Sequence, residues 1–123
     1  MKEIIVLIGL FFCHFLADFT QMSRPYMLSA KKFGAPVTPI AAHAAVHAVL
    51  MLIFLRIMGY KGINVATVVM LQWISHTLID VTKGKINFYF PATREATNVS
   101  HWWVFGLDQF AHAVIIIIMW NML

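Results

Sequence analysis

Four long apolar segments constrain the fold of this 123-residue chain more than any other feature. They cover about residues 3–22, 37–58, 63–83 and 101–123, and each has about the 20 residues that a helix needs to cross a bilayer. Charged residues make up only 11% of the chain, against about a quarter in a soluble domain. The sequence therefore predicts an all-α membrane protein, a four-transmembrane-helix bundle of up-down-up-down order that forms one domain over residues 1–123.

The connections between the segments carry helix-starting and helix-ending signals. Pro25 suits the first turn of a helix, so we expect residues 26–33 to form a short interfacial helix between spans one and two. A glycine between two basic residues, Lys83-Gly84-Lys85, predicts the end of span three. The longest connection then covers residues 86–100.

Basic residues predict the orientation of the bundle. On one side fall Lys2, Arg56 and Lys61, and on the other fall Arg24, Lys31, Lys32, Lys83, Lys85 and Arg94. Because basic residues are enriched in cytoplasmic loops, we expect a multi-pass protein of the inner (cytoplasmic) membrane, with loops 23–36 and 84–100 in the cytoplasm and both termini outside. The net charge of +4 suits anionic headgroups, so the expected partner is membrane lipid and not nucleic acid.

Inside the apolar segments, two metal-capable side chains stand four residues apart, and this happens four times. Residues at i and i+4 lie on one face of a helix. Ionisable groups within membrane helices are costly and point to function. All three aspartates and five of the six histidines belong to these pairs, which are His14/Asp18, His43/His47, His76/Asp80 and Asp108/His112.

The four pairs are predicted to lie at one depth, roughly 5–15 Å from the cytoplasmic face at about 1.5 Å per helical residue. We therefore expect the eight side chains to form one ring of ligands. Imidazoles and carboxylates suit a divalent transition metal, zinc first, with iron or manganese as alternatives, at one or two ions per chain. His101 is expected at the mouth of this site. Residues expected to orient ligands or bind substrate are Gln21, Lys83, Gln109 and Arg24.

Two other uses of the same side chains stay open. A relay of histidines and aspartates could carry protons. A bis-histidine haem could use two of His43, His47, His76 and His112, but it would leave three buried aspartates unexplained.

The ordered motifs H-x3-D (residues 14–18), H-x3-H (43–47), H-x3-D-x2-K (76–83) and D-Q-x2-H (108–112) resemble a family of small integral membrane proteins of bacteria and phages. That family is classed as a domain of unknown function. The resemblance spans the whole chain and supports the motif residues as the site, but it implies no activity. More distantly, the motifs are similar to those of membrane-embedded zinc hydrolases, including the ceramidase and receptor-like hydrolase group, in chemistry only.

Three functions fit these residues. The first is a membrane-embedded metal-dependent hydrolase with a mono- or dinuclear His/Asp site near the cytoplasmic leaflet, acting on a lipid-linked or membrane-partitioned substrate. In it, Asp80 or Asp108 would act as general base. The second is a divalent metal or proton transporter or channel, and the third is an interaction protein whose bundle is pinned by metal. We favour the hydrolase because the outer halves of the spans are apolar; its site would open to the bilayer or to a homodimer interface.

Overall fold

The computed structural model describes residues 1–20 and 22–123. Over these residues the chain forms five α-helices, one short 3-10 helix and no strand, so the all-α prediction is confirmed. The long helices are α1 (Lys2–Phe19), α3 (Val37–Ile57), α4 (Ile63–Tyr89) and α5 (Val99–Asn121). The short ones are α2 (Pro25–Phe33) and the 3-10 helix η1 (Pro91–Arg94).

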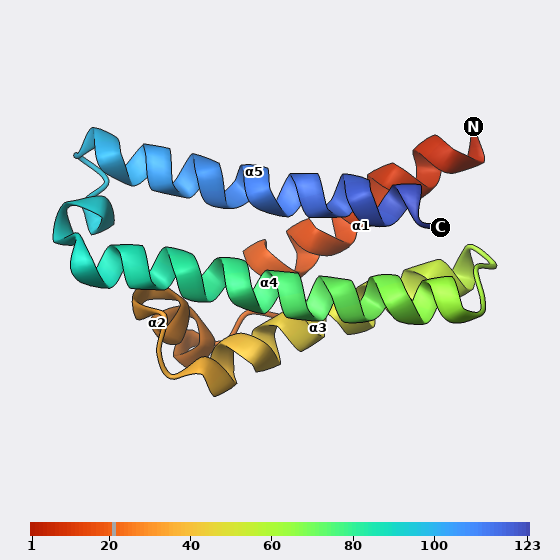
Figure 1. Ribbon diagram of the computed structural model, residues 1–123, viewed down its shortest axis with the longest axis horizontal. Helices are drawn as coiled ribbons and strands as arrows, with labels where there is room; N and C mark the ends of the chain where they lie inside the picture. The colour runs from red at the N-terminus through yellow and green to blue at the C-terminus, as the bar shows by residue number, and fades with distance from the viewer. Residues whose placement is uncertain (21) are drawn as a thin grey trace.

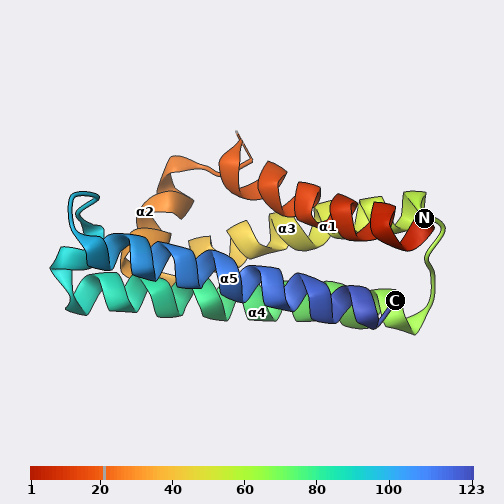
Figure 2. The same ribbon diagram turned by 90° about the horizontal axis from the view of Figure 1, so that it is seen from above.

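The four long helices form a closed ring in which neighbours run antiparallel (Figure 1, Figure 2). In this ring α3 packs on α1 and α4, and α5 packs on α4 and α1. Both chain termini lie at one end of the bundle, while α2 and η1 lie at the other (Figure 2). At the terminal end, Trp120 Nε1 donates a hydrogen bond of 3.0 Å to the carbonyl of Glu3, which ties the last helix to the first.

Three of the helices, α3, α4 and α5, are long and apolar enough to cross a membrane by length and composition. The 18 residues of α1 include Lys2, Glu3 and Asp18, and this charge leaves α1 outside that set. All four long helices nevertheless turn large apolar side chains outward. Among the exposed ones are Ile8, Phe12, Ile53, Leu78 and Phe110. Exposed apolar surface on every long helix indicates a membrane protein.

The half of the ring nearest the termini is filled by apolar side chains. The buried cluster there consists of Val6, Leu10, Met51, Leu55, Val65, Val68, Ile116 and Met119. In a bilayer such packing stabilises the bundle through van der Waals contact more than through release of water. The buried ionisable side chains are gathered in the other half, toward α2.

The short helix expected after span one is present and begins at Pro25, as predicted. It ends at Gly34, whose φ of 65° and ψ of 21° are left-handed and whose N–H donates to the carbonyl of Ala30. The helix packs on α3 and α4, with Met27 and Ala30 buried. It therefore covers the end of the ring, and its last turn, which contains Lys31, lies against the interior of the ring.

The prediction that Lys83-Gly84-Lys85 ends span three is wrong. Helix α4 continues through Gly84 to Tyr89. A Cβ atom at Gly84 would collide with the backbone of Gly34 and with the carbonyl of Lys31, because α2 approaches α4 at this point. The glycine thus serves close packing of two helices, and the chain that links α4 to α5 is shorter than expected.

Candidate metal centre

Five histidines from four helices meet within the ring. They are His14 of α1, His43 and His47 of α3, His76 of α4 and His112 of α5. Ring centroids lie 3.7 Å apart for His47 and His76, and 4.2 Å apart for His76 and His112. All five side chains are buried, and the most exposed, His14, retains 9% of its surface. The i, i+4 spacing predicted that the two residues of each pair share one helix face. In the structure this face, with its histidines, is turned toward the interior of the ring.

Two of the three aspartates join these histidines. The Oδ1 atom of Asp18 lies 2.9 Å from His43 Nε2 and 3.3 Å from His47 Nε2. The Oδ2 atom of Asp80 lies 3.2 Å from His76 Nε2. Ligand-capable atoms within 4.8 Å of one another form two groups that could hold a metal ion: Asp18, His43, His47 and His76 in one, and His76, Asp80 and His112 in the other.

Several buried polar atoms in this cluster have no hydrogen-bond partner among the described residues. They include Nδ1 of His76, Nε2 of His112 and Oδ1 of Asp80. Buried polar atoms are normally paired, since each unpaired one costs about 1–3 kcal/mol. Imidazole nitrogens and carboxylate oxygens are common ligands of zinc and related metals. The donor set therefore fits a metal ion.

Lys31 enters the same cluster from α2. Its Nζ atom lies 2.9 Å from His43 Nε2, 3.0 Å from Asp18 Oδ1 and 3.3 Å from Asp80 Oδ2. Burial alone would lower the pKa of Lys31, but the carboxylates of Asp80 and Asp18 outweigh burial and raise this pKa above its ordinary value. The cluster thus contains a cation between its two carboxylates. The sequence predicted Lys31 on the interfacial helix, as one of the basic residues that could bind an anionic headgroup or phosphate, and not among the ligands, because α2 lies outside the i, i+4 pattern.

Asp108 stands beside the cluster and, among the described residues, belongs to neither ligand group. Its Oδ2 atom accepts hydrogen bonds from Lys83 Nζ at 3.2 Å and from Gln109 Nε2 at 3.1 Å. The Nδ1 atom of His112 lies 2.8 Å from the Asp108 carbonyl, and the Nε2 atom of the same ring lies 4.0 Å from Asp80 Oδ1. Of the eight predicted ligands, seven thus lie close together, whereas Asp108 pairs with Lys83.

The other predicted residues have different positions. His14 Nε2 lies 3.3 Å from Asp18 Oδ2, so it reaches the cluster through this aspartate. Arg24 is exposed at the N-cap of α2. Gln21, predicted to orient a ligand or bind substrate, lies outside the described residues.

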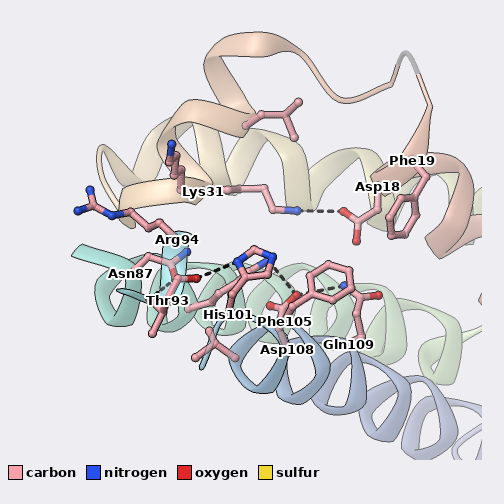
Figure 3. Close-up of a pocket in the computed structure, with 14 residues that line it drawn as sticks. Asp18, Phe19, Lys31, Asn87, Thr93, Arg94, His101, Phe105, Asp108 and Gln109 are labelled. Atoms are coloured by element: carbon pink, nitrogen blue, oxygen red, sulfur yellow. Dashed lines mark hydrogen bonds and ion pairs between the residues drawn. The ribbon is translucent and has the colours of Figure 1, made fainter. Parts of the chain in front are cut away.

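An open cavity of about 320 Å³ adjoins the cluster between α2, α4, α5 and η1 (Figure 3). Asp18, Lys31 and Asp108 line it on the side of the cluster. Figure 3 shows Arg94 at the end of the cavity away from Asp18, and His101 between Arg94 and Asp108. The Nδ1 atom of His101 lies 2.9 Å from the carbonyl of Thr93. His101 was predicted at the mouth of the site, whereas Arg94 was predicted only as a loop charge. The buried cluster therefore has an entrance lined by basic and apolar residues.

Comparison with known proteins agrees with the predicted family. No curated protein and no solved structure matches the chain. One family model does match, over residues 6–123, and it therefore includes every residue of the cluster and of the cavity. The match brings no activity with it, as the resemblance implied. The chain belongs to the family described as "Protein of unknown function (DUF3307)".

Proposed function

We propose that this protein is a four-span hydrolase of the inner membrane that uses a divalent metal, zinc or alternatively iron or manganese, to cleave a membrane-partitioned substrate. One observation carries this proposal: a buried set of imidazoles and carboxylates with unpaired atoms adjoins an open cavity. Asp18, Lys31 and Asp108 line the cavity from the side of the cluster. A substrate in the cavity would therefore lie next to the metal-capable atoms.

The fourth span in this proposal is α1. It completes the ring by packing on α3 and α5, and Ile4, Ile8 and Phe12 on its outer face are more than half exposed. Lys2 stands at the end of α1, where a lysine side chain can reach the headgroups. The end of the bundle that carries α2 and η1 holds most of the basic residues, so we propose that it faces the cytoplasm.

The chain's own residues would have distinct roles in hydrolysis. Six would hold one or two ions, in the two groups described above: Asp18, His43, His47, His76, Asp80 and His112. A metal bound there would supply Lewis acidity and an activated water molecule. We propose Asp108 as the acceptor of the water's proton, since it lines the cavity and lies outside the ligand groups of the described residues. Lys83 and Gln109 hold its carboxylate in place.

The apolar half of the bundle favours this hydrolase over a transporter. A carrier needs polar groups that continue across the membrane. Between the histidines and the end of the bundle that holds the termini, Gln72 is buried one turn before His76. The rest of the core in that direction consists of the apolar cluster, which includes Val65 and Leu55. The site therefore resembles a pocket that opens toward one side of the membrane.

Elemental analysis of detergent-purified protein tests the metal centre. The wild type should carry about one or two ions per chain. His76→Ala should lose most of this metal, because His76 is shared by both ligand groups. His101→Ala is the matched control: it removes a histidine that contacts the Thr93 carbonyl outside the cluster, and it should keep the metal. Less than about a tenth of an ion per wild-type chain, after purification without chelator, would contradict the proposal.

Proteoliposomes separate the two functions. A hydrolase should consume a lipid-like ester, amide or phosphate while its metal stays in place. A transporter should instead carry zinc, manganese or protons across a tight bilayer, and Asp80→Asn should abolish that flux. Saturable flux that Asp80→Asn abolishes would reject the hydrolase and support the transporter.

A further inference from the structure

We infer that this protein binds an anionic, phosphate-headed lipid, with its head in the basic cavity and its chain in a groove between α4 and α5. That this lipid is also the substrate rests on the proposed function. The binding site itself is carried by two adjoining features of the structure, one charged and one apolar.

The charged feature is the far wall of the cavity. Lys32 of α2 and Arg94 of η1 both line it, and both lie over the ring of Phe33, at 5.6 Å and 5.7 Å from its centroid. Two cations held near one aromatic ring repel each other, and a bound anion would offset this repulsion. Among the described residues, neither is within ion-pair distance of a carboxylate; Lys31 and Lys83, by contrast, each pair with an aspartate. This wall therefore has uncompensated positive charge.

A buried amide adds a neutral donor to the same wall. Asn87 retains 8% of its surface and lines the cavity. Its amide contacts Thr93 Oγ1 at 2.8 Å, and the same hydroxyl lies 2.7 Å from the Phe90 carbonyl. Because the amide carries two N–H groups, at least one of them is left to donate in either orientation of the amide. Guanidinium, ammonium and amide donors together are the groups that recognise the oxygens of a phosphate.

The apolar feature is a groove of about 280 Å³ between α4 and α5. Its walls include Leu78, Ile86 and Leu107, and both leucines are 60% exposed, so the groove opens outward. The hydroxyl of Thr82, also in the groove, donates to the carbonyl of Leu78 at 2.8 Å. In a bilayer this groove faces hydrocarbon, and a lipid chain matches its lining.

The cavity and the groove meet at the Lys83–Asp108 pair. Lys83, Val104 and Asp108 line both of them. Free phosphate would use the cavity alone, and a neutral lipid would use the groove alone. A molecule with an anionic head and a hydrocarbon chain uses both, and the bond between head and chain then passes beside Asp108. This is the carboxylate proposed to accept the proton during hydrolysis.

Binding of dodecylphosphonate, which has no ester to hydrolyse, tests this inference. Binding to the full-length protein in maltoside micelles should be measured by titration calorimetry, with and without metal. Dodecylphosphonate should bind about tenfold or more tightly than either inorganic phosphate or dodecyltrimethylammonium. Equal binding of the anionic and cationic amphiphiles would overturn the inference, and this comparison needs no variant.

Variants then locate the two parts of the ligand. Lys32→Gln combined with Arg94→Gln should weaken dodecylphosphonate binding about tenfold or more, through loss of charge-assisted contacts. Ala111→Leu should fill the groove and remove the advantage of a dodecyl over a methyl chain. Ala41→Leu is the matched control, since it fills an apolar groove of about 250 Å³ between α3 and α4 that basic residues do not line. An equal effect of the two leucine variants would contradict the assignment of the chain.

Failure of this inference and failure of the proposed function give different results. Lipid binding by a protein that carries no metal and hydrolyses nothing would uphold the lipid site and reject the hydrolase. Metal-dependent turnover with no preference for an anionic amphiphile would uphold the hydrolase and reject the lipid site.

Discussion

The ammonium group of Lys31 lies 3.0 Å from Asp18 Oδ1, inside a cluster of buried imidazoles. The same nitrogen lies 3.3 Å from Asp80 Oδ2, so one lysine of α2 joins carboxylates of α1 and α4. Two carboxylates in a low-dielectric interior require positive charge nearby. A lysine provides part of it, and a divalent ion would provide more. We therefore expect Lys31 and a bound metal to share, and in part compete for, the same carboxylates.

Lys31→Met should destabilise the metal-free protein, because Asp18 and Asp80 lose their cation. Removal of one partner of a buried ion pair costs about 3–5 kcal/mol. Zinc should then raise the melting temperature more in the variant than in the wild type, since binding to the native state alone stabilises it. Thermal unfolding in detergent, with chelator and with zinc, measures both effects. Lys32→Met, at the exposed neighbour, should leave the zinc response unchanged, and an identical response in Lys31→Met would contradict the competition.

Gly84→Ala should push α2 away from α4 and withdraw Lys31 from the cluster. The new methyl group would meet the backbone of Gly34, which cannot move aside as a side chain can. We expect a loss of about 1–3 kcal/mol of stability, typical of overpacking, measured by thermal unfolding. Gly106→Ala is the control, because nothing lies within 4 Å of its added Cβ, and alanine in a helix should stabilise by about 0.5–1 kcal/mol. Equal stability of both variants would show that α2 is not held at Gly84.

Asp80→Asn and Asp108→Asn should separate metal binding from proton transfer. Asp80 belongs to a ligand group, so its variant should lose metal. Asp108 pairs with Lys83 beside the cluster, so its variant should keep the metal but lose about 10²- to 10⁴-fold in turnover. Metal content and hydrolysis of a lipid-like substrate check the two outcomes. Metal loss in Asp108→Asn equal to that in Asp80→Asn would make Asp108 a ligand, as the eight-residue ring predicted.

Cysteine labelling tests the proposed orientation. Cys13 is the only cysteine and is buried, so Cys13→Ser provides a clean background. Lys61→Cys and Lys85→Cys place exposed thiols before and near the end of α4. A membrane-impermeant maleimide added to intact spheroplasts should label position 61 and reach position 85 only after permeabilisation. Labelling of both from outside would show that α4 does not cross the membrane, and the reverse pattern would invert the topology.

The helices and the inward-facing histidines were predictable from the sequence because both are local properties. Long apolar segments form helices whatever they pack against, and a spacing of four residues places two side chains on one helix face. The matched positions of the four pairs along their segments predicted that they would meet at one level. Five histidines and two aspartates do meet there.

Contacts between helices were decided by the tertiary structure alone. Spacing determined which side chains share a face, but the docking of α2 determined that Lys31 stands among the ligands, and the rotation of α5 determined that Asp108 pairs with Lys83. Gly84 shows the same division: its neighbours in sequence suggested a helix end, whereas its neighbour in space, Gly34, explains why glycine is required. The physical reason is that helix geometry depends on residues a few positions apart, while the partner that a helix face meets depends on how whole helices pack.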